Sequence, residues 1–178
     1  KRIKSRAITA ENFTGEKGRG GMATEGTGKA VSADLGQTFK ISPSVIIAKK
    51  STFTVCDIKG SGEVRHVWVT CAPVGFQGIV AEFFYDGADF PSVSMPLGKL
   101  FAIGGDNPSA VNSLAVTVNP RGGMNLYWRV PQRTENHVQK YYGRRYYGLL
   151  SDRLSVKKNT SFDVLFSCFL QRIFARDA

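Results

Sequence analysis

The sequence predicts an all-β protein, a jelly-roll β-sandwich preceded by an irregular N-terminal arm. Short runs rich in β-branched and aromatic residues recur from residue 37 onward, separated by Gly, Pro, Asp and Asn. Runs at this spacing are typical of β-sandwiches and jelly rolls. Between residues 37 and 134 no stretch shows the apolar spacing of a convincing amphipathic helix. A chain of 178 residues is long enough to bury one core.

Composition divides the chain into three parts. Residues 1–36, the arm, are glycine-rich and polar without apolar periodicity, so we expect an extended segment or a long loop. Residues 37–134 form the predicted jelly-roll domain, and residues 135–178 form a tail of different character. The strands expected in the domain span 39–41, 45–48, 52–58, 63–70, 79–85, 93–97, 114–118 and 124–130.

The two tryptophans fall in alternating runs. Trp68 shares one face of 63–70 with Val64 and His66, and Trp128 lies on the apolar face of 124–130. Because alternate residues of a strand point to the same face, we expect both indoles to pack in the core. Stacking on a sugar ring or a base is the alternative for both.

The formal charge is +10, from 24 Lys and Arg against 14 Asp and Glu. An excess of this size is typical of nucleic-acid binders. The first six residues alone carry +4, and the tail has 8 basic against 4 acidic residues. Residues 7–134 have 12 basic against 10 acidic residues, so the body is nearly neutral. We therefore expect no nucleic-acid partner, and keep a basic nucleic-acid binder as a third alternative.

Several other classes are excluded. No run of 18 apolar residues exists, so we expect no membrane span. Three cysteines and two histidines are too few and too scattered for a disulfide framework or a zinc site. The segment 15–29 (GEKGRGGMATEGTGK) imitates a phosphate-binding loop, but Ala23 and Ala30 occupy positions where that loop needs Gly and Ser or Thr. We expect no metal and no cofactor.

Carboxylates are present, but none forms an evident pair. Glycosidases place two of them on either side of the bond that they cleave. The candidates are Glu11, Glu16, Glu25, Glu63, Glu82, Asp86 and Asp89. The last two flank a turn, and Glu82 lies on the face of its strand opposite the apolar residues, so turn chemistry and solvent exposure explain them.

A series of segments resembles one bacterial family. They are 5–18 (SRAITAENFTGEKG), 34–37 (DLGQ), 60–68 (GSGEVRHVW), 84–87 (FYDG), 91–93 (PSV), 95–98 (MPLG) and 118–128 (VNPRGGMNLYW). In this order they resemble glycoside hydrolase family 172, formerly a domain-of-unknown-function family. The resemblance covers about residues 6–133.

The resemblance implies two tandem jelly rolls, assembled into trimers or hexamers, that act on fructofuranosides or D-arabinofuranosides. The family's catalytic glutamates lie in the second roll, in motifs similar to GEGE and GTGxEDY, and neither motif occurs here. The corresponding place reads PLGKL at 96–100. We therefore assign no catalytic residue and expect this half to be inactive alone. The expected partners are a furanoside carbohydrate and further copies of the chain, in the bacterial cytoplasm.

The tail departs from the family. Members continue in the style of ITVYYQIDY and, ten residues later, YFHASF, whereas this chain has YYGLLSDRL at 146–154 and LFSCFL at 165–170. For both segments, codons can be chosen that encode this chain in one frame and the family's residues when they are read one base later. We hypothesise a shift of the reading frame near Thr134 or Glu135, with a genuinely divergent C-terminus as the alternative. An amphipathic helix over Phe162–Phe174 is a further expectation.

Five residues are the candidates for binding sugar hydroxyl groups. They are Asn12, Glu16 and Lys17 in the arm, and Asn125 and Tyr127 in the segment 118–128. Tyr127 lies opposite the apolar face of its run, so its ring is also the better candidate for stacking on a sugar. For the arm residues, loop structure is the alternative. For the whole chain, the alternative function is a stand-alone carbohydrate-binding or structural, oligomerising jelly roll.

Overall fold

The computed structural model describes residues 2–32, 34–58, 62–84, 88–105, 107, 109–119, 122–128, 130–132, 151–156 and 162–174. For 2–3, 62, 130–132, 151–156 and 162–174 the description is of the backbone alone. Within these residues, no helix is both long enough and apolar enough to cross a membrane.

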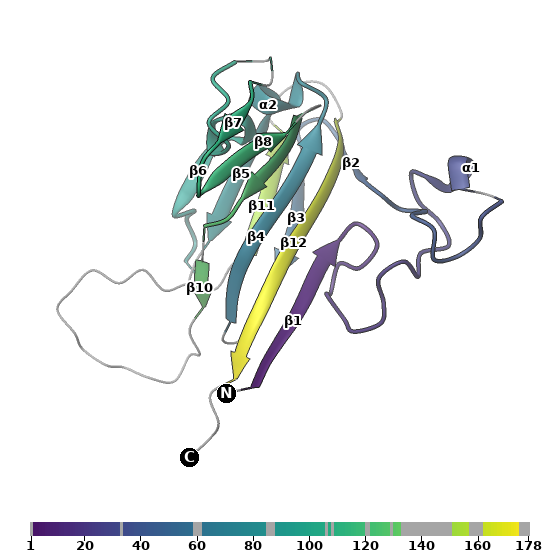
Figure 1. The fold of residues 1–178 in the computed structure, drawn as a ribbon. Helices are drawn as coiled ribbons and strands as arrows, with labels where there is room; N and C mark the ends of the chain where they lie inside the picture. The colour runs from purple at the N-terminus through teal and green to yellow at the C-terminus, as the bar shows by residue number, and fades with distance from the viewer. Residues whose placement is uncertain are drawn as a thin grey trace.

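Antiparallel strands form two sheets (Figure 1). In the part of the chain that the structure describes, the larger sheet has eight strands in the order β1-β12-β4-β9-β8-β7, with β10 beside β4 and β2 beside β12. The smaller sheet has four strands in the order β3-β11-β5-β6. The architecture confirms the predicted all-β class.

The bounds of the elements follow the chain. The larger sheet contains β1 (Arg2–Thr9), β2 (Val45–Ile47), β4 (Gly62–Cys71), β7 (Val111–Asn112), β8 (Val116–Asn119), β9 (Gly123–Leu126), β10 (Val130–Gln132) and β12 (Phe162–Phe174). The smaller sheet contains β3 (Thr52–Asp57), β5 (Ile79–Phe84), β6 (Val93–Pro96) and β11 (Ser151–Val156). The described residues also contain three helices of four residues each: α1 (Lys29–Ser32), α2 (Gly75–Gly78) and α3 (Leu97–Leu100).

Apolar side chains from both sheets form one core. The largest fully buried ones are Phe76, Phe101, Ile47, Ile79, Leu97, Ile103, Met124 and Val64. In β5 the burial of Ile79, Ala81 and Phe83 follows the alternation that the sequence predicts. Removing one such side chain from water contributes about 1.5–3 kcal/mol to folding.

The two helices that follow β4 and β6 contact each other at a glycine. Gly98 of α3 is buried, and a Cβ atom there would lie 2.9 Å from Cβ of Phe76 in α2. That distance is shorter than any ordinary carbon contact. Glycine at this position therefore lets α3 pack directly against the Phe76 side chain.

A bulge interrupts the alternation of β4. The neighbouring strand β12 pairs Phe169 with His66 and the next residue, Leu170, with Val64, so that Arg65 is an extra residue in β4. An extra residue in one strand shifts the side chains beyond it to the opposite face.

The bulge overturns the predicted faces of 63–70. Val64 and Val69 are buried and Val67 packs against the core, so His66 and Trp68 lie on the outer face of the sheet. The prediction that Val64 shares a face with His66 and Trp68 is wrong, and so is the prediction that the Trp68 indole packs in the core.

The second tryptophan also lies outside the core. Strand β9 ends at Leu126, and the backbone N–H of Tyr127 donates to the Ala115 carbonyl at 2.8 Å. Trp128 lies beyond the end of β9 and is 50% exposed. The predicted core position of Trp128 is therefore wrong.

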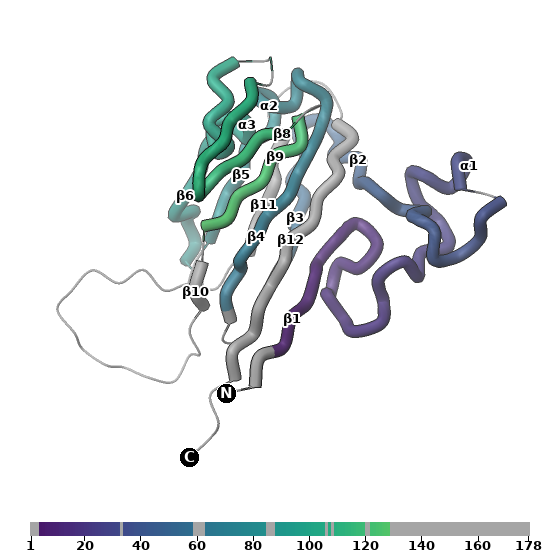
Figure 2. Tube along the Cα trace, in the orientation of Figure 1, coloured from purple at the N-terminus to yellow at the C-terminus, as the bar shows by residue number. Residues whose placement is uncertain are grey.

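The arm contains more order than its composition indicates. β1 occupies its first part and pairs with β12 along its whole length, from Arg2 opposite Phe174 to Thr9 opposite Ser167. The next residues are loop, apart from α1. Figure 2 shows this part of the arm running away from the sheets before the chain returns at β2. The expected strand at 39–41 is absent from the structure.

Residues Phe162–Phe174 form strand β12, so the expected helix there is wrong. The strand lies between β1 and β4, where its backbone groups bond to both neighbours. Tertiary pairing of this kind overrides a local helical periodicity.

Candidate functional site

A tight loop follows β1 and is closed by Asn12. The backbones of Thr9 and Asn12 exchange hydrogen bonds of 3.1 and 2.9 Å. The Asn12 amide then spans the loop, with Nδ2 donating to the Glu16 carbonyl at 2.9 Å and Oδ1 accepting from the Glu16 N–H at 3.2 Å and the Thr14 hydroxyl at 3.3 Å. Asparagine favours turns because its amide bonds to nearby backbone in this way. The loop places Glu16 and the next residue beside β1.

This loop, β1 and the end of β3 line an open cleft of about 500 Å³. A volume of this order suits a small ligand. The residues that give the cleft its chemistry are Arg6, Glu16, Lys17, Asp57, Ile8 and Ile58. Ile8 and Ile58 are buried, so they provide an apolar floor beneath the charged groups.

Gly15 shapes the inner wall of the cleft. Its φ of +63° lies in the left-handed region, and a Cβ atom there would lie 3.1 Å from Cγ1 of Ile8. Both the backbone conformation and the close approach favour glycine at this position.

The charges of the cleft balance. Arg6 and Lys17 supply two cations, and Glu16 and Asp57 supply two carboxylates. Glu16 also pairs with Arg19 at 3.5 Å, but both side chains are more than 60% exposed, so this pair has little effect on stability. Ammonium and guanidinium groups donate hydrogen bonds and carboxylates accept them, so the cleft offers both functions to a neutral, hydroxylated ligand.

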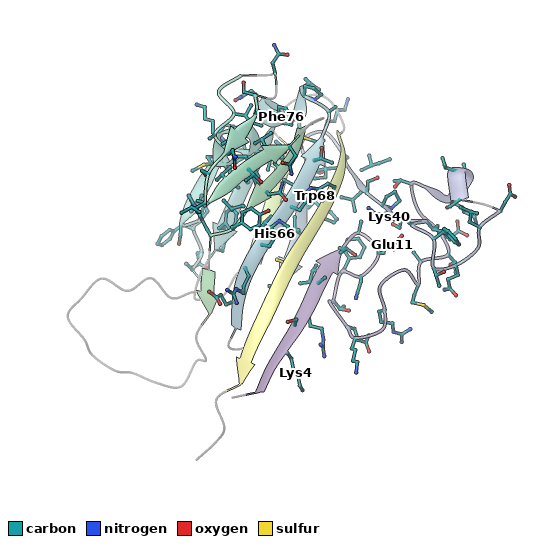
Figure 3. The ribbon with its side chains drawn as sticks, viewed as in Figure 1. Lys4, Glu11, Lys40, His66, Trp68 and Phe76 are labelled. Atoms are coloured by element: carbon teal, nitrogen blue, oxygen red, sulfur yellow. The ribbon has the colours of Figure 1, made fainter. Side chains whose placement is uncertain are left out.

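A second group of side chains lies on the outer face of the eight-stranded sheet (Figure 3). We call it the aromatic face, formed by His66, Trp68, Asn125 and Tyr127. The imidazole of His66 stacks on the Tyr127 ring, with centroids 4.8 Å apart and an angle of 11° between the planes. His66 and Trp68 belong to β4, which pairs with β9 at Trp68 and Asn125.

The buried side chain of Asn125 supports the aromatic face through hydrogen bonds. Its side chain is 6% exposed, and its Oδ1 lies 3.1 Å from Nε2 of His66. Its Nδ2 donates to the carbonyls of Thr117 and Gly123, both at 3.5 Å. A buried amide needs such partners, and here they fix the orientation of the His66 ring.

The five predicted binding residues therefore fall into two separate groups. Glu16 and Lys17 line the cleft, and Asn12 shapes the loop that carries them. Asn125 and Tyr127 lie on the aromatic face. In the sheet order β1-β12-β4-β9, three strand spacings separate the two groups, or about 14 Å. The structure does not bring the arm residues and the β9 residues together.

Four further residues were not among the five predicted binding residues. Arg6 and Asp57 complete the cleft, but they come from β1 and β3, which are distant in sequence. His66 and Trp68 complete the aromatic face, and alternation alone assigns them to the wrong side because it cannot reveal the bulge at Arg65.

Other chemically interesting groups have structural roles. The Glu11 carboxylate accepts the Ser42 N–H at 3.0 Å, and Glu82 accepts the Ser94 hydroxyl at 3.2 Å. Burial raises the pKa of the Cys71 thiol from 9.0 to about 12, so it is a poor nucleophile at neutral pH. Among the described residues, no three His, Cys, Asp or Glu side chains gather in a way that could hold a metal ion.

A family model described as the GH172 first beta-sandwich domain matches residues 25–163. The chain belongs to the GH172 family. A search of curated proteins gave no match. Membership confirms the resemblance for the motif segments from 34–37 to 118–128, whereas the segment 5–18 lies before the matched residues. It identifies the GH172 domain as a glycoside hydrolase family domain.

The match to the GH172 model runs past Thr134 into the tail. The tail also supplies the backbone of β11, which lies between β3 and β5, and of β12, which lies between β1 and β4. The boundaries at 36 and 134, and the shifted reading frame, stay predictions.

Proposed function

We propose that this GH172 domain is the sugar-binding, non-catalytic jelly roll of a glycoside hydrolase that acts on furanosides. The cleft beside β1 is the observation that carries the proposal, because it gathers two of the predicted hydroxyl-binding residues, Glu16 and Lys17, with Arg6 and Asp57. The choice of a fructofuranoside or D-arabinofuranoside comes from the family resemblance.

The chemistry of the cleft fits a neutral sugar better than an anion. Glu16 and Asp57 accept hydrogen bonds from hydroxyl groups, whereas Arg6 and Lys17 donate to hydroxyl and ring oxygens. An anionic ligand would gain from the two cations but would be repelled by the two carboxylates. The apolar floor of Ile8 and Ile58 suits the C–H groups of a sugar ring.

The same cleft is a poor catalytic centre. The general acid of a glycosidase is a carboxyl group in apolar surroundings, with a second carboxylate across the scissile bond. Glu16 and Asp57 are both exposed to solvent and share the cleft with two cations. We propose that these carboxylates bind the sugar and that another part of the protein supplies proton transfer.

Two measurements on the isolated chain test this function. In the first, aryl fructofuranosides and aryl D-arabinofuranosides are incubated with the chain, and we expect no release of the aryl alcohol. In the second, calorimetric titration with methyl furanosides measures binding by the unaltered chain and by Lys17→Ala. Loss of a hydrogen bond from a charged group weakens binding about tenfold.

Lys29→Ala is the matched control. Lys29 is also an exposed lysine of the arm, but it pairs with Glu25 outside the cleft. We expect its affinity for the furanoside to equal that of the unaltered chain. Hydrolysis that disappears in Glu16→Gln would contradict the non-catalytic assignment, and equal affinities in Lys17→Ala and Lys29→Ala would contradict binding in the cleft.

A structural, oligomerising function is the second candidate, supported by exposed apolar side chains on the arm. They are Phe13, Met22, Val31 and Leu35, with Val31 91% exposed. Apolar groups gathered on a projecting segment favour contact with another chain. Native mass spectrometry would show a homo-oligomer that Val31→Ser with Leu35→Ser converts to monomers. The trimer or hexamer and the cytoplasmic location stay predictions.

A further inference from the structure

The aromatic face differs in chemistry from the cleft. From His66 to the end of β4, and on the described parts of β8 and β9, outward positions carry aromatic, amide, hydroxyl or no side chains: His66, Trp68, Thr70, Thr117, Asn119, Gly123 and Asn125, followed by Tyr127. The Glu63–Arg65 ion pair lies on the other side of the bulge in β4. None of these positions holds a Lys, Arg, Asp or Glu, and none holds an aliphatic residue. A face of this kind suits a ligand that is uncharged, flat and hydroxylated.

The rings of the aromatic face are held in place before any ligand binds. His66 is fixed between the Tyr127 ring and the Asn125 amide. Tyr127 is 44% exposed, so part of its ring remains open to solvent while His66 supports it. Aromatic rings that are already oriented lose little conformational freedom when they bind.

Trp68 extends the face across two strands. A Cβ atom at Gly123 would lie 3.5 Å from Nε1 of Trp68, so the indole reaches over β9. Thr70 follows Trp68 on the same face of β4, and its hydroxyl donates to the Gly122 carbonyl at 3.1 Å. The two rings, Trp68 and Tyr127, thus lie along one surface with polar groups between and beside them.

We propose that the aromatic face is a second carbohydrate surface, on which the rings of Trp68 and Tyr127 stack against consecutive sugar units of a neutral glycan. The choice of a furanose glycan rests on the proposed function, whereas the stacking surface itself does not. His66 and Asn125 are positioning residues that orient Tyr127. Because stacking uses more than one ring, a chain of sugars binds more tightly than a single sugar.

Intrinsic fluorescence reports on this surface directly. The chain has two tryptophans, Trp68 on the aromatic face and Trp128, which follows Tyr127 and is half-exposed. The probe is a series of inulin oligosaccharides, which are neutral chains of fructofuranose, with free fructose for comparison. We expect a saturable change in tryptophan emission with the oligosaccharides and a much weaker response to fructose.

Tyr127→Ala removes one stacking ring and leaves both tryptophans as reporters. We expect the apparent Kd for the oligosaccharides to rise about 2- to 12-fold, the range that one aromatic contact contributes. Tyr127→Leu keeps the apolar bulk without the flat ring, and we expect a rise in the same range. Phe90→Ala is the matched control, because Phe90 is a 71% exposed aromatic residue on a different segment.

Lys17→Ala separates this surface from the cleft. A response weakened in Tyr127→Ala and Tyr127→Leu but retained in Lys17→Ala supports the aromatic face, even if binding in the cleft fails its own test. A response abolished in Lys17→Ala and unchanged in both Tyr127 variants overturns the proposal and leaves the cleft intact. A blue shift with protein concentration alone, without any response to sugar, also overturns it, because the face would then be covered by another copy of the chain.

Discussion

The inner and outer faces of β4 carry different chemistry on one strand. Val64 and Val69 face inward and are buried, whereas His66 and Trp68 face outward and contact β9 residues. The inner face is aliphatic and stabilises the sandwich. The outer face is aromatic and polar, and its stacking adds little to the core. Residues that stabilise the core and residues proposed to bind sugar thus lie on opposite faces of a single strand. The bulge at Arg65 determines which residues lie on each face.

The largest expected effect is on the core that the inner face covers. Phe76→Ala deletes a fully buried ring, and we expect it to lower the free energy of unfolding by about 3–5 kcal/mol. Urea denaturation followed by circular dichroism measures the change. Phe90→Ala, at an exposed phenylalanine, is expected to change it by less than about 0.5 kcal/mol. Equal losses in the two variants would mean that Phe76 is not a core residue.

Alanine substitutions at two glycines compare the tolerance of the core and of the outer face for one added methyl group. Gly98→Ala places Cβ 2.9 Å from Phe76 Cβ, and we expect a loss of about 1–3 kcal/mol in the free energy of unfolding. Gly123→Ala on the outer face meets Trp68 at an ordinary 3.5 Å, so we expect little change. Thermal denaturation of both variants tests the comparison, and a larger loss in Gly123→Ala would reverse it.

A smaller effect is expected from the amide beneath the aromatic face. Asn125→Ala removes the partner of His66 Nε2 and the donor to the Thr117 carbonyl, which lowers the free energy of unfolding by about 1 kcal/mol. The control is Asn119→Ala, an exposed asparagine on the neighbouring strand β8. If both variants unfold at the same urea concentration, the Asn125 network does not support the outer face.

The smallest effect on stability is expected from Cys71, at the end of β4. Its folded pKa of about 12 exceeds the ordinary 9.0, so the folded state disfavours the thiolate. The neutral thiol favours folding fully below pH 9, and this contribution is lost as the pH rises from 9 to 12. We expect iodoacetamide to label Cys71 far more slowly in the folded than in the urea-unfolded chain at pH 8, as peptide mapping would measure. Equal rates would show that the thiol is accessible.

Much of the fold could be predicted from the sequence, because local patterns determine it. The alternation of Ile79, Ala81 and Phe83 describes β5 correctly, and Met124 and Leu126 are buried in β9 as their spacing indicates. The incorrect predictions fall on segments whose structure depends on the strand beside them. β1 is a strand because β12 lies beside it, and the run Phe162–Phe174 is a strand because two neighbours bond to its backbone.

The candidate site was predicted only in part for a similar reason. Glu16 and Lys17 share a loop motif, and their proximity follows from the sequence. Their partners Arg6 and Asp57 come from β1 and the end of β3, and the fold brings both to the same cleft. The bulge at Arg65 leaves no mark on the sequence of β4 itself, because it is defined by the register with another strand.

The pairing of β1 with β12 has a consequence for folding during synthesis. Arg2 lies opposite Phe174, so every residue up to Phe174 must be synthesised before these two strands can pair completely. At about 5–20 residues per second, β1 waits roughly 10–30 s for its partner. Closing so long a loop also slows the final step. During that interval the edges of β1 and β4 are unpaired templates for other chains, so a chaperone that shields strand edges would raise the yield of folded protein more than one that acts after release.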